Sequence, residues 1–457
     1  MSKRTKRIIL AIVLVQVVLI IALLILPQAV LAIPGRYRVA LADRYPVVSQ
    51  ITEDMIARVA PVADALPAPV ELSERVAITI PTLAPTLVPP PTPTPTPTAI
   101  VKDAPVQVAT SVVESTPNST PLPTSTPTPE PLPDDVLLTG IKRIQQSFNN
   151  CGPANLTQVL NWHGDVTTQA EAASYLKPNP EDRNVSPWQL SDYVNEFTEL
   201  KSTVHSGGDM EMIKRFIAAG LPVVIEKGYE PDTTRSQGWF GHYLTVFGYD
   251  EELQMFHSMD SYLRVDEVTG RADPYEEIER YWQQFNYTFY VVYEPDQEAQ
   301  VQSILGQDLL QPMQMWLKAA ERAQAELEND PDNAFIWFNL GTSLTRLGEL
   351  TGSPEYYESG AAAFDQALAI GLPPRMLWYE FRPYLAYMKV GRYEDMITLA
   401  EAVLATQGGQ NVEETYLYQG HALLFQGDVA AAAAAYKRAL QLNQNFYPAE
   451  IALQSIS

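Results

Sequence analysis

The stretch from Gln145 to Leu156 reads QQSFNNCGPANL and holds Cys151, the single cysteine of the 457-residue chain. Gly152 and Pro153 follow this cysteine, and a helical pattern then runs to about His163. The pattern predicts that Cys151 lies at or just before the N-terminus of a helix. Unpaired N–H groups and the helix dipole lower the pKa of a thiol at such a position, so the sequence favours a thiolate.

Two further residues are candidates for the groups that assist a nucleophilic cysteine. Such a cysteine requires an imidazole to hold its proton, a group to orient that imidazole, and donors for the oxyanion. His242 lies in GHYLTVFGYD (241–250), at the beginning of a predicted strand, and Asp260 ends the next predicted strand. If the two strands are antiparallel neighbours, they bring His242 and Asp260 side by side. His257 lies in the predicted strand that ends at Asp260, and it is an alternative candidate for the base.

The sequence contexts of Cys151, His242 and Asp260 resemble those of the C39 and C39-like group of papain-like cysteine peptidases. The order Gln, Cys, His, Asp along the chain also matches, and the resemblance covers about residues 137–295. The resemblance implies an α+β papain-like fold with Cys151 as nucleophile, His242 as general base and acid, and Asp260 orienting His242. It also implies a glutamine upstream of the cysteine as oxyanion donor. The common family spacing of six residues gives Gln145, whereas the local pattern Gln-x-Phe-Asn-Asn-Cys gives Gln146, which we favour.

The surrounding sequence fits a mixed α/β domain over 134–299. Helical patterns follow Cys151 and span 188–197 and 210–219, and strand patterns span 221–226, 243–249, 255–259 and 287–293. One helical lobe packed on an antiparallel sheet is the simplest assembly of these elements. Bacteriocin exporters carry this kind of domain ahead of transporter helices, whereas no further membrane span is predicted in this chain after its N-terminus.

The N-terminus predicts a membrane anchor within residues 1–32. Four basic residues between Lys3 and Arg7 precede an apolar run from Ile8 to Leu26. As a helix this run would be about 28 Å long, close to the thickness of the hydrocarbon core. The basic cluster should stay in the cytoplasm, so we expect a single-pass cell-membrane protein whose remaining domains are extracytoplasmic. A cleaved signal ending at Ala32 is the alternative, and it also exports the chain.

Residues 33–133 separate this anchor from the folded part. Residues 33–80 carry no motif, although Ile51–Val59 could form one amphipathic helix. Residues 81–133 are rich in Pro and Thr, which predicts an extended stalk, or a linker without a spacing role.

From residue 300 to 457 the pattern is almost purely helical. Residues 330–446 resemble tetratricopeptide repeats, with Gly391 and Gly427 spaced 36 residues apart and an expected insertion at 351–357 between two helices. Unrelated helix pairs are the alternative. Such repeats would bind a protein or peptide partner.

The formal net charge of −23 argues against nucleic acid as a partner. A single cysteine excludes a disulfide within the chain, and the expected chemistry needs neither a metal nor an organic cofactor. We therefore expect a membrane-anchored extracytoplasmic cysteine peptidase that acts on a peptide or protein substrate. A papain-like acyltransferase, or an inactive scaffold or adhesion protein acting through its repeats, are the alternatives.

Overall fold

The computed structural model describes residues 65–69, 78–81, 131–230, 238–406 and 408–456, together with Gln16, Ile33 and Tyr37. Apart from Gln16, the predicted anchor at 8–26 lies outside these residues, as do the amphipathic stretch at 51–59 and most of the stalk. Within the described ranges, every helix is too short or too polar to cross a bilayer.

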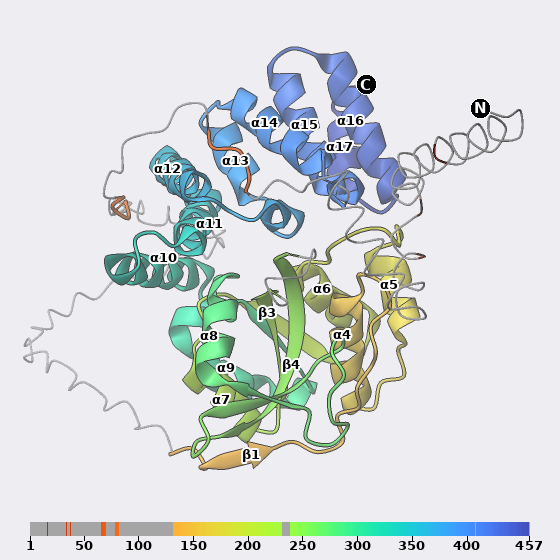
Figure 1. The fold of residues 1–457 in the computed structure, drawn as a ribbon, viewed down its shortest axis with the longest axis vertical. Helices are drawn as coiled ribbons and strands as arrows, with labels where there is room; N and C mark the ends of the chain where they lie inside the picture. Colours follow the sequence, from red (N-terminus) through yellow and green to blue (C-terminus); the bar gives the residue numbers. More distant parts are fainter. Residues whose placement is uncertain are drawn as a thin grey trace, which may run out of the picture. The chain divides into compact units, whose positions relative to one another are not determined.

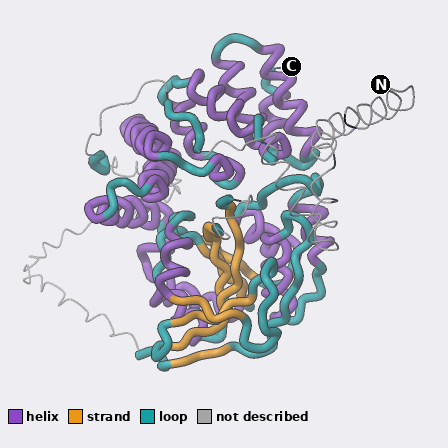
Figure 2. The backbone as a smooth tube through the Cα atoms, viewed as in Figure 1, coloured by secondary structure: helices purple, strands orange, loops and turns teal. Residues whose placement is uncertain are grey.

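A seven-stranded sheet forms the centre of the first folded part, counted over the described residues (Figures 1 and 2). The strand order is β2-β7-β3-β4-β5-β6, β1 also pairs with β4, and every one of these pairs is antiparallel. The strands are β1 Asp135–Leu137, β2 Lys201–His205, β3 Val223–Tyr229, β4 Phe240–Asp250, β5 Met255–Met259, β6 Arg271–Pro274 and β7 Phe289–Tyr293.

One helical lobe packs against this sheet, as the sequence predicts. It consists of α4 (Cys151–Trp162), α5 (Gln169–Leu176) and α6 (Pro187–Phe197). Capping boxes at Thr168 and Ser186 start α5 and α6 by satisfying N–H groups that have no partner inside the helix. The lobe buries Leu156 and Leu190 against Tyr243 of β4, which fixes α4 beside the strand that carries His242.

Three further helices pack with the sheet: α7 (Met210–Ala218), α8 (Tyr275–Gln283) and α9 (Glu298–Leu310). The predicted helices and the four predicted strands are confirmed within a few residues. The strands β1, β2 and β6 and the helices α5 and α8 were not among the predicted elements.

The C-terminal region is helical, as predicted. Its α-helices are α10 (Pro312–Asn329), α11 (Ala334–Thr351), α12 (Pro354–Ile370), α13 (Arg382–Lys389), α14 (Tyr393–Leu404), α15 (Glu413–Phe425), α16 (Val429–Leu442) and α17 (Tyr447–Gln454). The expected insertion at 351–357 is wrong. Only Gly352 and Ser353 join α11 to α12, because Gly352 ends α11 in the left-handed conformation and Pro354 begins α12 at once.

Part of the segment without a motif packs on these helices. Leu66 is buried, and its N–H donates to the carbonyl of Leu372 at 2.9 Å. The side-chain amide of Gln324 donates to the carbonyl of Ile78 at 2.5 Å. Short pieces of the region before the stalk therefore belong to the folded part of the chain.

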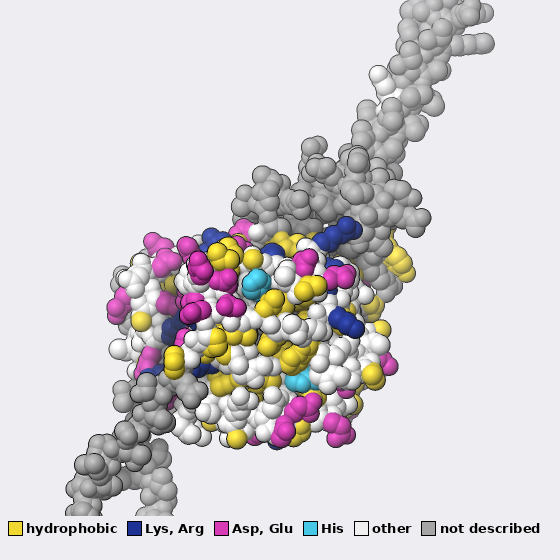
Figure 3. All heavy atoms as spheres, turned by 90° about the horizontal axis from the view of Figure 1, so that it is seen from below, with side chains coloured by type: hydrophobic (Ala, Val, Ile, Leu, Met, Phe, Trp, Pro, Cys, Tyr) yellow, Lys and Arg dark blue, Asp and Glu magenta, His cyan; other side chains and the backbone are white. Residues whose placement is uncertain are grey.

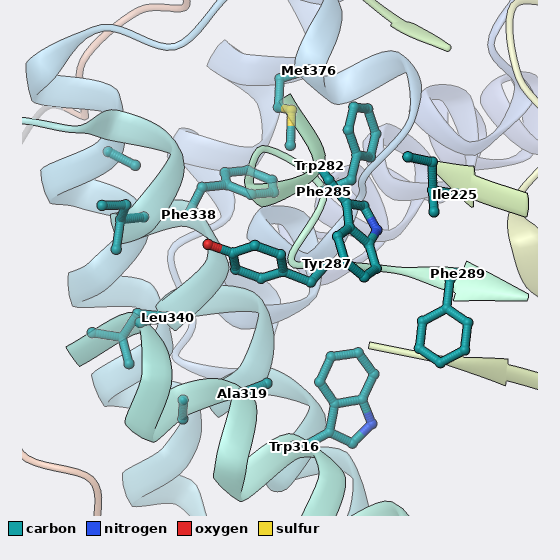
Figure 4. Packing of buried hydrophobic residues seen from close by; sticks show 14 of the residues in the cluster. Ile225, Trp282, Phe285, Tyr287, Phe289, Trp316, Ala319, Phe338, Leu340 and Met376 are labelled. Carbon is teal, nitrogen blue, oxygen red and sulfur yellow. The ribbon is translucent and has the colours of Figure 1, made fainter. Parts of the chain in front are cut away.

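The sheet and the helical region share one apolar core (Figure 4). Phe285 and Tyr287 follow α8, and the same core takes in Trp316 of α10 and Phe338 of α11. Polar bonds cross the same contact: the side-chain amide of Asn339 donates to the carbonyl of Gln283 at 2.6 Å. Burial of this aromatic surface couples the two regions, since apolar area removed from water is the main stabilising contribution. Many acidic side chains lie on the surface, and Figure 3 shows some of them on one face.

Candidate active site

Cys151 is the first residue of α4, where the sequence places it. Its side chain is partly exposed. The helix has no side-chain cap at Asn150, and the preceding Asn149 adopts a left-handed backbone with φ of 56°. The first N–H groups of a helix have no partner inside it, so this start leaves donors next to the sulfur.

His242 and Asp260 lie next to each other on the neighbouring strands β4 and β5. The register pairs Thr245 with Met259, which puts His242 just beyond the paired part and Asp260 directly after β5. His242 Nε2 lies 3.0 Å from Asp260 Oδ1, and both side chains are buried. Asp260 Oδ1 also accepts the backbone N–H groups of Tyr262 at 2.7 Å and Leu263 at 3.0 Å, which hold the carboxylate in place.

The three side chains polarise one another. Burial would raise the pKa of the Cys151 thiol, but a hydrogen bond to His242, the charge of His242 and the N–H of Tyr243 together bring it below its ordinary value. Burial would likewise lower the pKa of His242, but the charge and hydrogen bond of Asp260 and the contact with Cys151 raise it to about 9. The imidazolium in turn holds the pKa of Asp260 well below its usual range, against the effect of burial. These directions favour a thiolate–imidazolium pair.

The two candidate glutamines differ in their surroundings. Ser261 Oγ donates to Gln146 Oε1 at 2.9 Å, and the N–H of Gln146 donates to the carbonyl of Ser261. This bond fixes the amide orientation and leaves the Gln146 NH₂ group available as a donor. The side chain of Gln145 is exposed and accepts a hydrogen bond from Arg143. The geometry therefore favours Gln146 for an oxyanion.

Asn155 is a supporting residue that sequence reasoning missed. Its side chain is fully buried one turn after Cys151 and donates to the carbonyls of Cys151 at 2.9 Å and Tyr243 at 3.0 Å. It lies 3.1 Å from Ser261 Oγ, and Thr245 Oγ1 donates to its Oδ1 at 2.8 Å. Asn155 thus ties α4 to β4 and to the residue that orients Gln146. A polar residue on the buried face of a helix was the available signal.

The polar loop at 177–185 also supports the site. Lys177 is buried, and its Nζ donates to the carbonyls of Asn149 and Asp182, both at 2.8 Å. The side-chain amide of Asn149 donates to the same carbonyl of Asp182 at 3.1 Å. The loop therefore braces the turn that leads into Cys151.

The three other histidines between residues 134 and 299 lie in other contacts. His257 Nδ1 lies 3.1 Å from the carbonyl of Thr269, which precedes β6. Strand β5 lies between β6 and β4, the strand that carries His242. His163 lies 3.0 Å from the carbonyl of Val292, and His205 contacts the carbonyl of Leu309 at 3.1 Å. Over the residues that the structure describes, we find no group of three metal-binding side chains.

Residues 138–290 match the model of the Peptidase_C39 like family. The solved structures that are similar to this chain include the following two. A Bacillus anthracis protein described as a C39-like peptidase is 17% identical, covers 35% of this chain and 98% of its own, and has a TM-score of 0.30. Xylellain, a cysteine protease from Xylella fastidiosa, is 16% identical, covers 36% of this chain and 90% of its own, and has a TM-score of 0.26. No curated protein matches the chain.

The family match confirms the predicted resemblance for one part of the chain. The mixed α/β sheet domain resembles a C39-like peptidase domain, and a helical C-terminal region follows it. This assignment supports a function of the cysteine peptidase type.

Proposed function

We propose that this chain is a cysteine peptidase that hydrolyses peptide bonds through Cys151, His242 and Asp260. The observation that carries the proposal is the partly exposed thiol at a helix start, hydrogen-bonded to a buried imidazole that is itself 3.0 Å from a buried carboxylate. A nucleophile, a base and a group that orients the base are the minimum for this chemistry.

In the proposed reaction, the Cys151 thiolate attacks the carbonyl carbon of the substrate and forms a C–S bond. The carbonyl electrons move to oxygen, which the N–H of Cys151 and the NH₂ group of Gln146 stabilise. The His242 imidazolium then gives its proton to the leaving amine as the C–N bond breaks. A water molecule, deprotonated by His242, attacks the thioester and releases the acid and the thiol.

The direct test compares the full chain with Cys151→Ala and His242→Ala. A mixture of peptides of known sequence is incubated with each protein, and the products are identified by mass. We expect new fragments with the wild type only, and the masses of the two fragments from each cleavage should sum to the mass of the parent peptide plus one water. Products that carry an added amine instead of water would indicate acyl transfer, and an unchanged mixture with the wild type would contradict the proposal.

Since Cys151 is the single thiol of the chain, its reactivity can be followed without a substrate. The rate of alkylation by iodoacetamide is measured from pH 4 to 9. We expect the wild type to react well below the ordinary thiol pKa of about 8.5, and His242→Ala to lose this low-pH reactivity. A wild-type thiol that is inert, or that titrates in the same way without His242, would indicate the scaffold alternative.

We also propose that the N-terminal segment anchors the peptidase, with its folded part outside the cytoplasm, and that the C-terminal helices are tetratricopeptide repeats that bind a protein or peptide. The basic cluster and apolar run support the first part, and the succession of packed helices from α11 to α16 supports the second. Extraction of membranes with carbonate, followed by protease treatment of intact cells, tests the anchor and its orientation.

A further inference from the structure

A residue of the helical region lies against the strand that carries His242. Tyr379 directly follows the short helix η2 (Pro374–Trp378). Its ring atoms Cε1 and Cδ1 lie 3.0 and 3.1 Å from the position that a Cβ on Gly241 would take. The Gly241 N–H hydrogen-bonds to the Tyr379 hydroxyl. The absence of a side chain at Gly241, one residue before His242, therefore lets this ring approach the strand.

The orientation of backbone groups places Tyr379 on the same edge of β4 as the nucleophile. Tyr243 directs its N–H to the Cys151 sulfur and its carbonyl to Asn155, so its backbone groups point away from β3 and towards α4. In an antiparallel sheet, backbone groups point to the same edge at every second residue. The N–H of Gly241 thus points to the edge occupied by Cys151, and there it contacts Tyr379.

Electrostatics agree with this placement. Burial raises the pKa of Tyr379 above its ordinary range, and the charge of the Cys151 thiolate raises it further. Tyr379 and Cys151 are both partly exposed residues.

Tyr379 is held in position from several sides. The side-chain amide of Asn184, in the loop before α6, donates to the Tyr379 carbonyl at 3.3 Å. Its ring packs edge-on against Phe285 at 5.8 Å and Trp239 at 6.1 Å between centroids. The Arg183 guanidinium lies over the neighbouring Trp378 at 5.5 Å. A ring fixed in this way defines a wall, because moving it would break contacts with both the helical lobe and the sheet.

We propose that Tyr379 is a specificity-determining residue of the peptidase, by which the helical region forms part of the substrate-binding surface and excludes bulky side chains beside Cys151. This inference rests on the proposed function, and it assigns to the helical region a role in addition to partner binding. The substrates would be peptides with a small side chain at the position that lies along the Gly241 edge of β4.

The test measures the size limit at Cys151 in the full chain, first without a substrate. The wild type, Tyr379→Ala and Tyr379→Phe are alkylated with two iodoacetamides that carry an N-methyl or an N-isobutyl group. The preference for the smaller reagent should fall by about tenfold in Tyr379→Ala, the range that a few methylenes give in an apolar site. Tyr379→Phe keeps the ring and should keep the wild-type preference. An unchanged preference in a folded Tyr379→Ala protein would overturn the inference.

A general loosening of the helical region would change the alkylation rates with both reagents by the same factor, so the ratio of the two rates would stay the same. Tyr384→Leu is the matched control, because Tyr384 stacks on Tyr418 within the helical region at 5.2 Å. Tyr379→Leu replaces the alanine variant if thermal unfolding shows that the latter does not fold, and we expect the same direction of change.

Peptide cleavage separates this inference from the proposed function. If the wild type cleaves, Tyr379→Ala should accept larger residues next to the scissile bond, and cleavage with an unchanged residue preference would contradict the inference alone. If no variant cleaves any peptide while the reagent ratio changes as expected, the peptidase proposal fails and the size limit at Cys151 stands.

Discussion

Replacing Asp260 by asparagine isolates the electrostatic contribution of the carboxylate to the Cys151–His242 pair. Asn can still accept the N–H groups of Tyr262 and Leu263 through its Oδ1, so the backbone geometry should survive. The negative charge 3.0 Å from His242 is lost. The pKa of His242 stands at about 9 against an ordinary 6.5, a difference of about 2.5, which corresponds to about 3 kcal/mol. Asp260 is the foremost group that raises this pKa.

The sign of the effect follows from the proton transfer between the two side chains. Stabilising the imidazolium shifts the equilibrium from thiol and imidazole towards thiolate and imidazolium. Losing about 3 kcal/mol of that stabilisation should reduce the equilibrium constant for forming the thiolate–imidazolium pair by roughly a hundredfold. The low-pH reactivity of Cys151 should therefore disappear, and the midpoint of its titration should move upward.

The assay is the iodoacetamide rate of the single thiol between pH 4 and 10, in the wild type and in Asp260→Asn. The control is Asp365→Asn, since Asp365 is also a buried aspartate and is bonded to Tyr387 and Arg392 in the helical region. This control should lose stability without a change in the pH profile. If Asp260→Asn reacts at pH 6 as fast as the wild type, Asp260 does not hold the imidazolium and the electrostatic reasoning is refuted.

Three further predictions address the oxyanion site, the support of the site and the helical region. Gln146→Ala should reduce peptide turnover by about 100-fold without changing the alkylation rate, whereas Gln145→Ala should leave both unchanged; equal effects would contradict the assignment of the donor. Asn155→Leu should lower the free energy of unfolding by about 3 kcal/mol, because the buried acceptors of Asn155 lose their donor. Chemical denaturation measures this change, and an unchanged midpoint would show that these acceptors find other donors. Gly420→Ala should destabilise the chain by about 1–2 kcal/mol, since the added methyl would overlap the ring of Tyr436, and a rise in the melting temperature would indicate that α15 and α16 can move apart.

Local sequence determined the elements that carry the candidate site. Gly152 and Pro153 are enough to predict the helix start at Cys151, because a helix N-terminus tolerates a missing donor. The β-branched and aromatic run after Gly241 predicts β4, and the resemblance of the three motifs predicts the C39-like domain. The helical character of the C-terminal region is likewise readable from its composition and period.

Tertiary structure alone decided which side chains meet. The local pattern already favours Gln146 over Gln145, but the hydrogen bond that orients the Gln146 amide comes from Ser261, which lies 115 residues further along the chain. The same holds for Lys177 bracing the turn before Cys151. Contacts of this kind arise from packing between elements, whereas periodicity and capping report only on neighbours in sequence.

The placement of Tyr379 is the clearest case of this division. The sequence assigns Tyr379 to a helical region and Gly241 to a strand, 138 residues apart, with nothing that links them. Burial of the shared aromatic core brings the helical region onto the sheet, and the absence of a Cβ at Gly241 then admits the ring. The sequence by itself determined the chemistry that Cys151 and His242 offer. The folded structure decided what surrounds them, because shape next to the sulfur depends on distant segments that pack together.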